Sequence, residues 1–170
     1  MVMDVRRGAE PFKRLFFALP VEENQRRALA GWRRELQLRD GKPVPVDNFH
    51  VTLAFLGDVD AVLVPAVCGA VDALSLPDAA LRLVLDRLQV WPKAAALVLE
   101  PEQAPAALRQ LVYALQQAML PLGIALSSRE YRPHLTLSRS YSGQLPEAAS
   151  APEFFLTARR FVLYESRKGQ

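Results

Sequence analysis

The chain carries the tetrapeptide His50-Val51-Thr52-Leu53, and the same pattern returns as His134-Leu135-Thr136-Leu137. The sequence has two histidines, and each one opens a copy of this pattern. Both copies are rich in aliphatic and β-branched residues, which favour strands, and successive side chains of a strand point to opposite faces. Each copy therefore places an imidazole and a hydroxyl on one face and two aliphatic side chains on the other. The repeat also predicts two related halves within one body.

The rest of the sequence alternates strand signals with helical signals. Apolar runs and period-two alternation predict strands at residues 14–19, 50–56, 81–90, 95–99, 134–137 and 154–164. Within this set, 81–90 and 95–99 read as an antiparallel pair, and Arg159-Arg160 interrupts the last strand. Spacings of three and four predict helices at residues 21–38, 60–74 and 104–120. This order favours an α+β fold in which helices pack on antiparallel sheets.

Length and composition fit a single domain, residues 1–170, built from two small lobes that share a core. Hydrophobic residues make up 51% and charged residues 23%, which indicates a compact soluble protein. Lys and Arg outnumber Asp and Glu by 21 to 18, so the surface would tolerate a polyanion. Cys68 lacks a disulfide partner in the chain, and the apolar run 15–19 is too short for a signal sequence or membrane span. We therefore expect a cytoplasmic monomer with no membrane association.

The two tetrapeptides suggest a specific chemistry if the halves pack about a pseudo-two-fold axis, because both polar faces then meet in one cleft. In-line displacement at a phosphate needs one group that takes a proton from the attacking oxygen and another that protonates the leaving oxygen. Two imidazoles titrate near neutral pH, so one can be neutral while the other is charged. Thr52 and Thr136 can donate hydrogen bonds to the non-bridging oxygens. We predict that His50 and His134 are the catalytic pair of a metal-independent phosphodiesterase that needs no cofactor.

Other interpretations of these residues compete with a catalytic site. A lone His-x-Thr-Leu is most simply a core histidine beside a strand-forming threonine, but two copies in a chain without other histidines favour a site. A metal centre needs more ligands than two histidines without a nearby cysteine provide. Phe49 is explained as well by the core as by stacking on an RNA base. Arg132, two residues before His134, is either a phosphate contact or a solvated surface residue.

Four blocks of the sequence resemble the two-histidine (2H) phosphoesterase superfamily, and within it the RNA 2′,3′-cyclic phosphodiesterases, also named 2′-5′ RNA ligases. These blocks are residues 14–19, 47–57, 131–137 and 163–166. The resemblance implies a bilobal fold in which two antiparallel β-sheets, backed by helices, are related by a pseudo-two-fold axis. It places the active site in the central cleft between the lobes.

The resemblance also implies an activity, namely hydrolysis of an RNA 2′,3′-cyclic phosphate end to a 2′-phosphate, with 2′-5′ joining of tRNA halves in vitro as a related reaction. By similarity, His50 would protonate the departing 3′ oxygen and His134 would activate water, although the residues themselves leave this order open. Thr52 and Thr136 correspond to threonines that contact the phosphate. Arg132 corresponds to a position where a basic residue approaches the substrate.

Two rival functions remain open at this point. A non-catalytic RNA-binding module would use the histidines only as hydrogen-bond donors. A phosphodiesterase for a small cyclic nucleotide or for ADP-ribose cyclic phosphate would use the same four side chains on a different substrate. Turnover of cyclic mononucleotides, compared with turnover of an oligonucleotide that ends in a cyclic phosphate, separates these possibilities.

Overall fold

The structure, a computed structural model, describes residues 11–74, 80–127 and 130–166. Over these ranges the chain forms two antiparallel sheets and three α-helices, which confirms the expected α+β fold. The large sheet has seven strands in the order β5-β6-β7-β3-β1-β9, with β2 paired to β7, and the small sheet consists of β4 and β8. The strands are β1 (Phe12–Pro20), β2 (Lys42–Pro43), β3 (His50–Asp60), β4 (Leu81–Leu85), β5 (Arg87–Trp91), β6 (Ala96–Glu100), β7 (Leu135–Arg139), β8 (Phe154–Ala158) and β9 (Val162–Glu165). The helices are α1 (Glu23–Glu35), α2 (Val64–Asp72) and α3 (Ala106–Met119).

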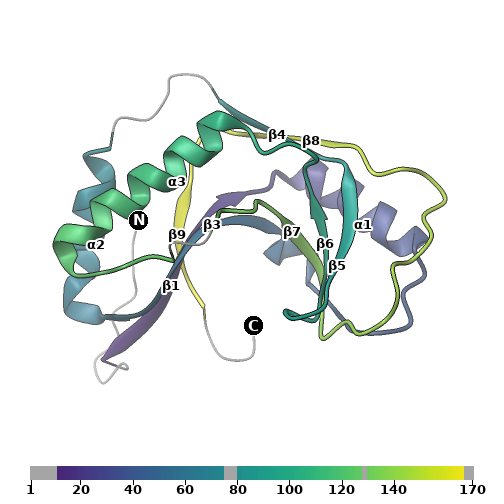
Figure 1. Cartoon of the computed structure of the whole chain (residues 1–170), viewed down its shortest axis with the longest axis horizontal. Helices are drawn as coiled ribbons and strands as arrows, with labels where there is room; N and C mark the ends of the chain where they lie inside the picture. Colours follow the sequence, from purple (N-terminus) through teal and green to yellow (C-terminus); the bar gives the residue numbers. More distant parts are fainter. Residues whose placement is uncertain (1–10, 75–79, 128–129, 167–170) are drawn as a thin grey trace.

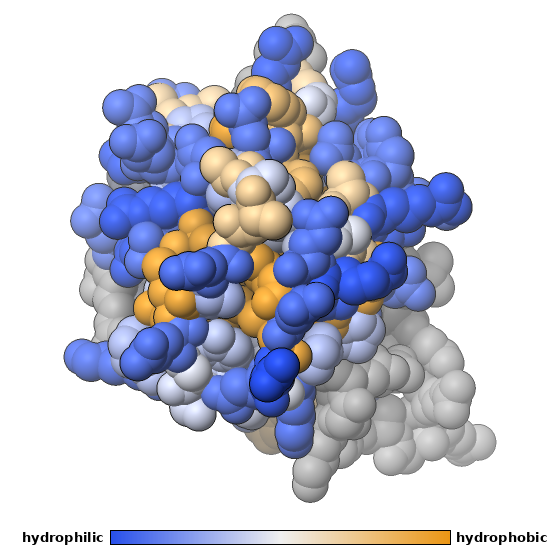
Figure 2. Space-filling model, turned by 90° about the vertical axis from the view of Figure 1, so that its right-hand side faces the viewer, coloured by the Kyte–Doolittle hydropathy of each residue, from blue (hydrophilic) through white to orange (hydrophobic). Residues whose placement is uncertain are grey.

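The large sheet bends into an arch whose helices lie on the outer side (Figure 1). Helices α2 and α3 flank the limb that contains β1, β3 and β9, whereas α1 lies beyond β5 and β6. The β4–β8 pair runs along the top of the arch. Seen from the side of α1 and β5, hydrophilic side chains surround a central apolar area (Figure 2). None of the described helices has the length and apolar character that a membrane span requires.

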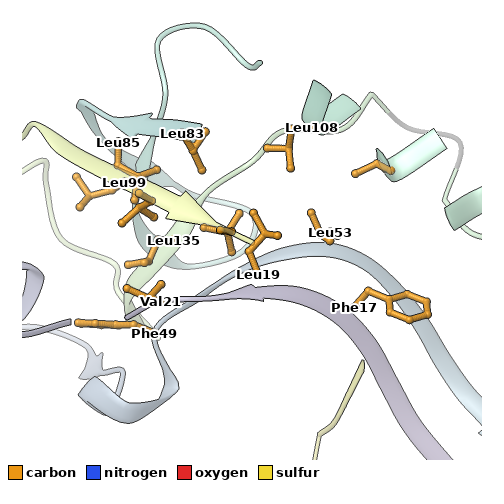
Figure 3. Packing of buried hydrophobic residues seen from close by; sticks show 14 of the residues in the cluster. Phe17, Leu19, Val21, Phe49, Leu53, Leu83, Leu85, Leu99, Leu108 and Leu135 are labelled. Atoms are coloured by element: carbon orange, nitrogen blue, oxygen red, sulfur yellow. The ribbon is translucent and has the colours of Figure 1, made fainter. Parts of the chain in front are cut away.

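The hydrophobic core fills the space between the outer face of the large sheet, helix α3 and the β4–β8 pair (Figure 3). Leu83 and Leu85 of β4 point toward Leu99 and Leu135 of the large sheet. Helix α3 contributes its apolar face, because residues at spacings of three and four lie on one side of a helix. The buried residues of that face are Leu108, Leu111, Val112, Leu115 and Met119.

Strands β3 and β7 join the two halves of the large sheet through one paired position, Val51 opposite Leu135. Both residues are fully buried, and both hold the second position of their tetrapeptide. Opposite residues of an antiparallel pair are related by a local two-fold axis. The pairing therefore superimposes one tetrapeptide on the other, as the repeat predicts.

Both tetrapeptide strands also carry a β-bulge at the same place. On β3, Leu53 has no paired residue on β1, since Ala18 pairs with Thr52 and Phe17 pairs with Ala54. On β7, Leu137 has no paired residue on β6, since Val98 pairs with Thr136 and Leu97 pairs with Ser138. A bulge reverses the alternation of the side chains that follow it. Phe55 and Arg139, each five residues after its histidine, are consequently both exposed.

Two predicted strands each divide between the two sheets. The prediction of a single strand over 81–90 is wrong at Asp86, where β4 turns to pair with β8 and only β5 pairs with β6. The Asp86 carboxylate accepts a hydrogen bond from the backbone N–H of Glu102 at 2.8 Å, a local contact that competes with a continuous ladder. Residues 154–164 divide in the same way, into β8 and β9, at the predicted Arg159-Arg160 break. The strand predicted for 50–56 instead continues to Asp60.

Two glycines with positive φ provide a test of the backbone. Gly41 (φ 81°) and Gly57 (φ 73°) both adopt the left-handed region, but only Gly41 is crowded: an added Cβ would lie 2.6 Å from Ser138 Oγ and 2.9 Å from the Arg139 carbonyl oxygen. We expect Gly57→Ala to lower the free energy of unfolding by about 1–2 kcal/mol, the usual cost of this backbone conformation. Gly41→Ala should cost more, because the β7 backbone must also move. Urea unfolding measures both, and equal losses would contradict the close approach of residues 41 and 139.

Candidate active site

Four motif side chains share the inner face of the sheet. His50, Thr52, His134 and Thr136 are partly exposed. The alternate residues Val51, Leu53, Leu135 and Leu137 are 0–2% exposed and face the core. Continuing the Val51–Leu135 register by one residue in each direction puts His50 opposite Thr136 and His134 opposite Thr52. Each imidazole thus lies across from the hydroxyl of the other tetrapeptide, as the two-fold arrangement requires.

The backbone orients both imidazoles in the same way. His50 Nδ1 lies 2.6 Å from the carbonyl oxygen of Asn48, and His134 Nδ1 lies 2.9 Å from that of Arg132. A carbonyl oxygen only accepts hydrogen bonds, so in each ring the proton resides on Nδ1. Each Nε2 is therefore the atom that can take up or release a proton. The two rings consequently offer equivalent atoms for acid-base chemistry.

The charges around the two imidazoles differ. Burial lowers the pKa of His50, and the positive charges of Arg139 and His134 lower it further, against a hydrogen bond to Asn48 that raises it. Burial also lowers the pKa of His134, where the Arg132 carbonyl and the Glu100 carboxylate raise it and the charge of the Arg132 guanidinium lowers it. The strand pairing puts the two rings on one face, and the charge of His134 is among the causes that lower the pKa of His50. Each ring has an arginine among the charges that act on it, and His134 also has the Glu100 carboxylate.

Different aromatic side chains pack against each histidine. The Trp91 ring lies 4.2 Å from that of His134, between centroids, and the Arg132 guanidinium covers the same indole at 4.6 Å. Arg132 also forms a 2.9 Å ion pair with Glu100, whose side chain is buried. On the other side, the Phe16 ring lies 5.2 Å from His50. The structure therefore places the predicted Arg132 beside His134, where its guanidinium already has two partners.

Two residues near the site escaped the sequence-based prediction. Trp91 ends β5, far from either tetrapeptide in the sequence, and no local pattern connects it to His134. Arg139 ends β7, and its charge acts on His50. The simple alternation from His134 assigns Arg139 to the core face, and only the bulge at Leu137 turns it outward. The signal that could have identified Arg139 is its position, which matches that of Phe55 in the other half.

Of the two interpretations of Phe49, the structure supports the core and contradicts contact with the substrate. Its side chain is 3% exposed and lies within the hydrophobic core. The Arg33 guanidinium lies 4.9 Å from the ring centroid and donates hydrogen bonds to the carbonyl oxygens of Val44 and Leu137. A ring enclosed in this way cannot stack on a base. Through the hydrogen bond to Leu137, Arg33 links α1 to the second tetrapeptide.

Tyr131 connects the two halves beside the site. Its hydroxyl donates a 2.8 Å hydrogen bond to the carbonyl oxygen of Thr52, so the segment before one tetrapeptide is tied to the backbone of the other. Burial raises the pKa of Tyr131, which keeps the hydroxyl protonated as a donor. This bond fixes the approach of the second histidine to the first.

A metal centre was the alternative to acid-base catalysis. Within residues 11–74, 80–127 and 130–166, no three side chains of His, Cys, Asp or Glu gather as a metal site would require. The side chain of Cys68 is partly buried against the core, as a structural cysteine would be, and burial raises the pKa of its thiol.

Comparisons with known proteins agree with this geometry. The family model described as LigT-like phosphoesterase matches the chain twice, at residues 19–97 and 98–170, so each match contains one tetrapeptide. The chain is 31% identical over 159 residues to the RNA 2′,3′-cyclic phosphodiesterase of Escherichia coli (strain K12), covering 93% of this chain and 89% of that protein. It is 29% identical over 135 residues to the enzyme of the same name from Geobacillus stearothermophilus, covering 77% and 43% of the two chains. The crystal structure of E. coli LigT complexed with 3′-AMP matches with a TM-score of 0.83 at 30% identity, covering 94% and 91%.

The charges around the imidazoles predict the titration of both rings. By histidine NMR, both pKa values should lie below the ordinary value of about 6.5. Glu100→Gln should lower the pKa of His134 further, while Arg139→Gln should raise that of His50. A pKa at or above 6.5 for either ring in the wild-type protein would contradict the burial that the structure gives them.

The same shifts predict how stability depends on pH. Because each folded-state pKa lies below the unfolded value, the unfolded chain binds more protons between these two values. The contribution of the histidines is therefore complete above about pH 6.5 and is lost as the pH falls toward the folded-state pKa values. Urea unfolding should show this loss in the wild-type protein and less of it in His50→Gln and His134→Gln.

Proposed function

The chain belongs to the LigT-like phosphoesterase family, and on that premise we propose that it hydrolyses RNA 2′,3′-cyclic phosphate ends to 2′-phosphate ends. The observation that best supports this activity is the pairing at Val51 and Leu135, which gives one sheet face two imidazoles with free Nε2 atoms and two hydroxyls. Curated relatives carry the name RNA 2′,3′-cyclic phosphodiesterase, which supports RNA as the substrate class.

In the proposed reaction a water oxygen attacks the phosphorus of the cyclic phosphate. One neutral imidazole takes the water proton at Nε2, and the bond between phosphorus and the 3′ oxygen breaks on the opposite side. The second imidazole, protonated at Nε2, gives its proton to the 3′ oxygen. The product carries a 2′-phosphate and a 3′-hydroxyl. One histidine has gained a proton and the other has lost one. Thr52 and Thr136 donate hydrogen bonds to the non-bridging oxygens, where negative charge accumulates.

The charges around the rings suggest which histidine has which role. Glu100 favours a proton on His134, whereas Arg139 and a charged His134 disfavour one on His50. The Glu100 carboxylate beside His134 is the basis on which we order the two roles. We assign the acid to His134 and the base to His50. This order is the reverse of the one that the family resemblance implies.

Arg139 and Arg132 take separate parts in this proposal. Arg139, exposed near His50, is suited to neutralise the charge of the bound phosphate. Arg132 is engaged by Glu100 and Trp91, and its ion pair keeps the carboxylate in place beside His134. Arg132 therefore positions Glu100, while its side chain, 60% exposed, keeps further N–H donors for the substrate.

Joining of RNA ends follows from the same chemistry. If a 5′-hydroxyl replaces water as the attacking group, the 3′ oxygen leaves in the same way and a 2′-5′ linkage forms. The four motif side chains would perform the same proton transfers. Joining of tRNA halves in vitro is thus a secondary activity of the proposed enzyme.

Substitutions in the tetrapeptides test the proposed chemistry. His50→Ala and His134→Ala should each lower kcat for a cyclic-phosphate-ended oligonucleotide by about 10²–10⁴-fold, the usual contribution of a general acid or base. Both variants should remain folded, because each ring is partly exposed on the inner face. Thr52→Ala and Thr136→Ala should lose less, since each removes one hydrogen bond to the phosphate.

Chelation and pH complete this test. Wild-type turnover should survive EDTA and should rise and then fall across the pH range in which imidazoles titrate. Loss of turnover in EDTA that zinc or manganese restores would overturn the acid-base mechanism in favour of a metal centre.

An inactive wild-type protein that still binds the oligonucleotide would favour the non-catalytic RNA-binding module. Turnover of cyclic mononucleotides alone would indicate a small-molecule substrate.

A further inference from the structure

We propose that Phe55, at the outer end of a row of aromatic rings that includes Phe16 and Tyr164, stacks on the penultimate nucleobase of the RNA, the base that precedes the nucleotide carrying the cyclic phosphate. The inference rests on the proposed function, because it extends the phosphate site along the substrate chain. These three residues, here called the aromatic row, come from β3, β1 and β9.

The aromatic row is continuous with His50. Phe16 lies at its centre, with ring centroids 5.2 Å from His50, 5.8 Å from Phe55 and 5.4 Å from Tyr164. Phe16 pairs with Phe55 on one neighbouring strand and with Tyr164 on the other, so the three side chains project from the same face. The phosphate site and the aromatic row are therefore parts of one surface.

A β-bulge brings Phe55 to this surface. Strict alternation from His50 and Thr52 would direct residue 55 into the core, but the bulge at Leu53 pairs Phe55 with Phe16 and turns it outward. The result is a phenylalanine that is 67% exposed on a strand. Phe155 is almost as exposed, so exposure alone does not distinguish Phe55; its contact with Phe16 in the row that continues from His50 favours a ligand contact.

Among the residues that the structure describes, the other half of the site has no comparable row of aromatic rings. Trp91 is the aromatic residue beside His134, but His134 and the Arg132 guanidinium already pack against it, and its indole nitrogen is buried. At the position that matches Phe55, this half has the cationic Arg139. Bases stack on aromatic faces and phosphates pair with guanidinium groups. The two halves therefore give the RNA strand a direction, with the bases on the side of β3, β1 and β9.

The reach of the aromatic row indicates which base it binds. The terminal base is attached to the same ribose as the cyclic phosphate, so its reach is that of the two rings next to His50, Phe16 at 5.2 Å and Tyr164 at 6.4 Å between centroids. Phe55 lies one ring farther out, beyond Phe16. The nucleotide that reaches it is the preceding one. The enzyme should therefore prefer an RNA end of two or more nucleotides over a cyclic mononucleotide.

The test compares adenosine 2′,3′-cyclic phosphate with an adenylyl dinucleotide that ends in a 2′,3′-cyclic phosphate, and with the same dinucleotide lacking its penultimate base. Wild-type kcat/KM should favour the complete dinucleotide over both other substrates by about 5–100-fold, the usual effect of stacking one base. Phe55→Ala should lose most of this preference through KM, because stacking remote from the phosphate contributes equally to substrate and transition state. Its turnover of the mononucleotide should fall far less.

Phe155→Ala is the matched control. Phe155 is 60% exposed and also lies on a strand, but it belongs to β8 in the other sheet. This variant should keep the wild-type preference. A Phe55→Ala variant that keeps the preference, or that loses mononucleotide and dinucleotide turnover equally, would overturn the proposal.

Binding separates this proposal from the proposed function. The product dinucleotide, which ends in a 2′-phosphate, can be titrated into wild-type protein and Phe55→Ala even if neither hydrolyses a cyclic phosphate. Weaker binding by Phe55→Ala supports the aromatic row whatever the turnover, and equal binding overturns it. Absence of wild-type turnover alone overturns only the hydrolytic function.

Discussion

The pairing of Val51 with Leu135 is the constraint on which the rest of the site depends. A shift of one residue in a strand register moves every side chain to the opposite face. Here such a shift would bury the imidazoles and expose the aliphatic residues that are now fully buried. The core therefore fixes the register, and the register assembles the site. The Tyr131 hydroxyl, bonded to the Thr52 carbonyl, reinforces the same junction from the inner side.

The two halves repeat a backbone design but differ in the side chains around it. Each histidine is oriented by a carbonyl two residues earlier, and each tetrapeptide strand has a bulge at its leucine. The residues around the two histidines differ in charge. Glu100 raises the pKa of His134, whereas Arg139 lowers that of His50. Two identical imidazoles can then perform opposite proton transfers. A second difference, Phe55 in one half and Arg139 in the other, is the basis of the strand direction that we propose for the RNA.

Sequence patterns were reliable where a single element determined the outcome. The alternation within each tetrapeptide placed the four polar side chains on one face, and the helices formed near their predicted positions. The patterns failed where another element decided. The Arg33 guanidinium of α1 lies over the Phe49 ring, and the sequence around Phe49 does not indicate this contact. Arg139 and Phe55 follow bulges that period-two reasoning does not include, and Trp91 meets His134 only through strand pairing.

We propose that His134 and His50 act together as acid and base on one phosphate, and a change of leaving group tests this pair most directly. In a dinucleotide whose cyclic phosphate has sulfur in place of the 3′ oxygen, the leaving thiol has a pKa of roughly 8.5 and departs without a proton donor. On this substrate His134→Ala should recover turnover near that of the wild-type protein, while His50→Ala should remain defective. Recovery by His50→Ala instead would contradict the assigned order, and recovery by neither variant would contradict the acid-base pair.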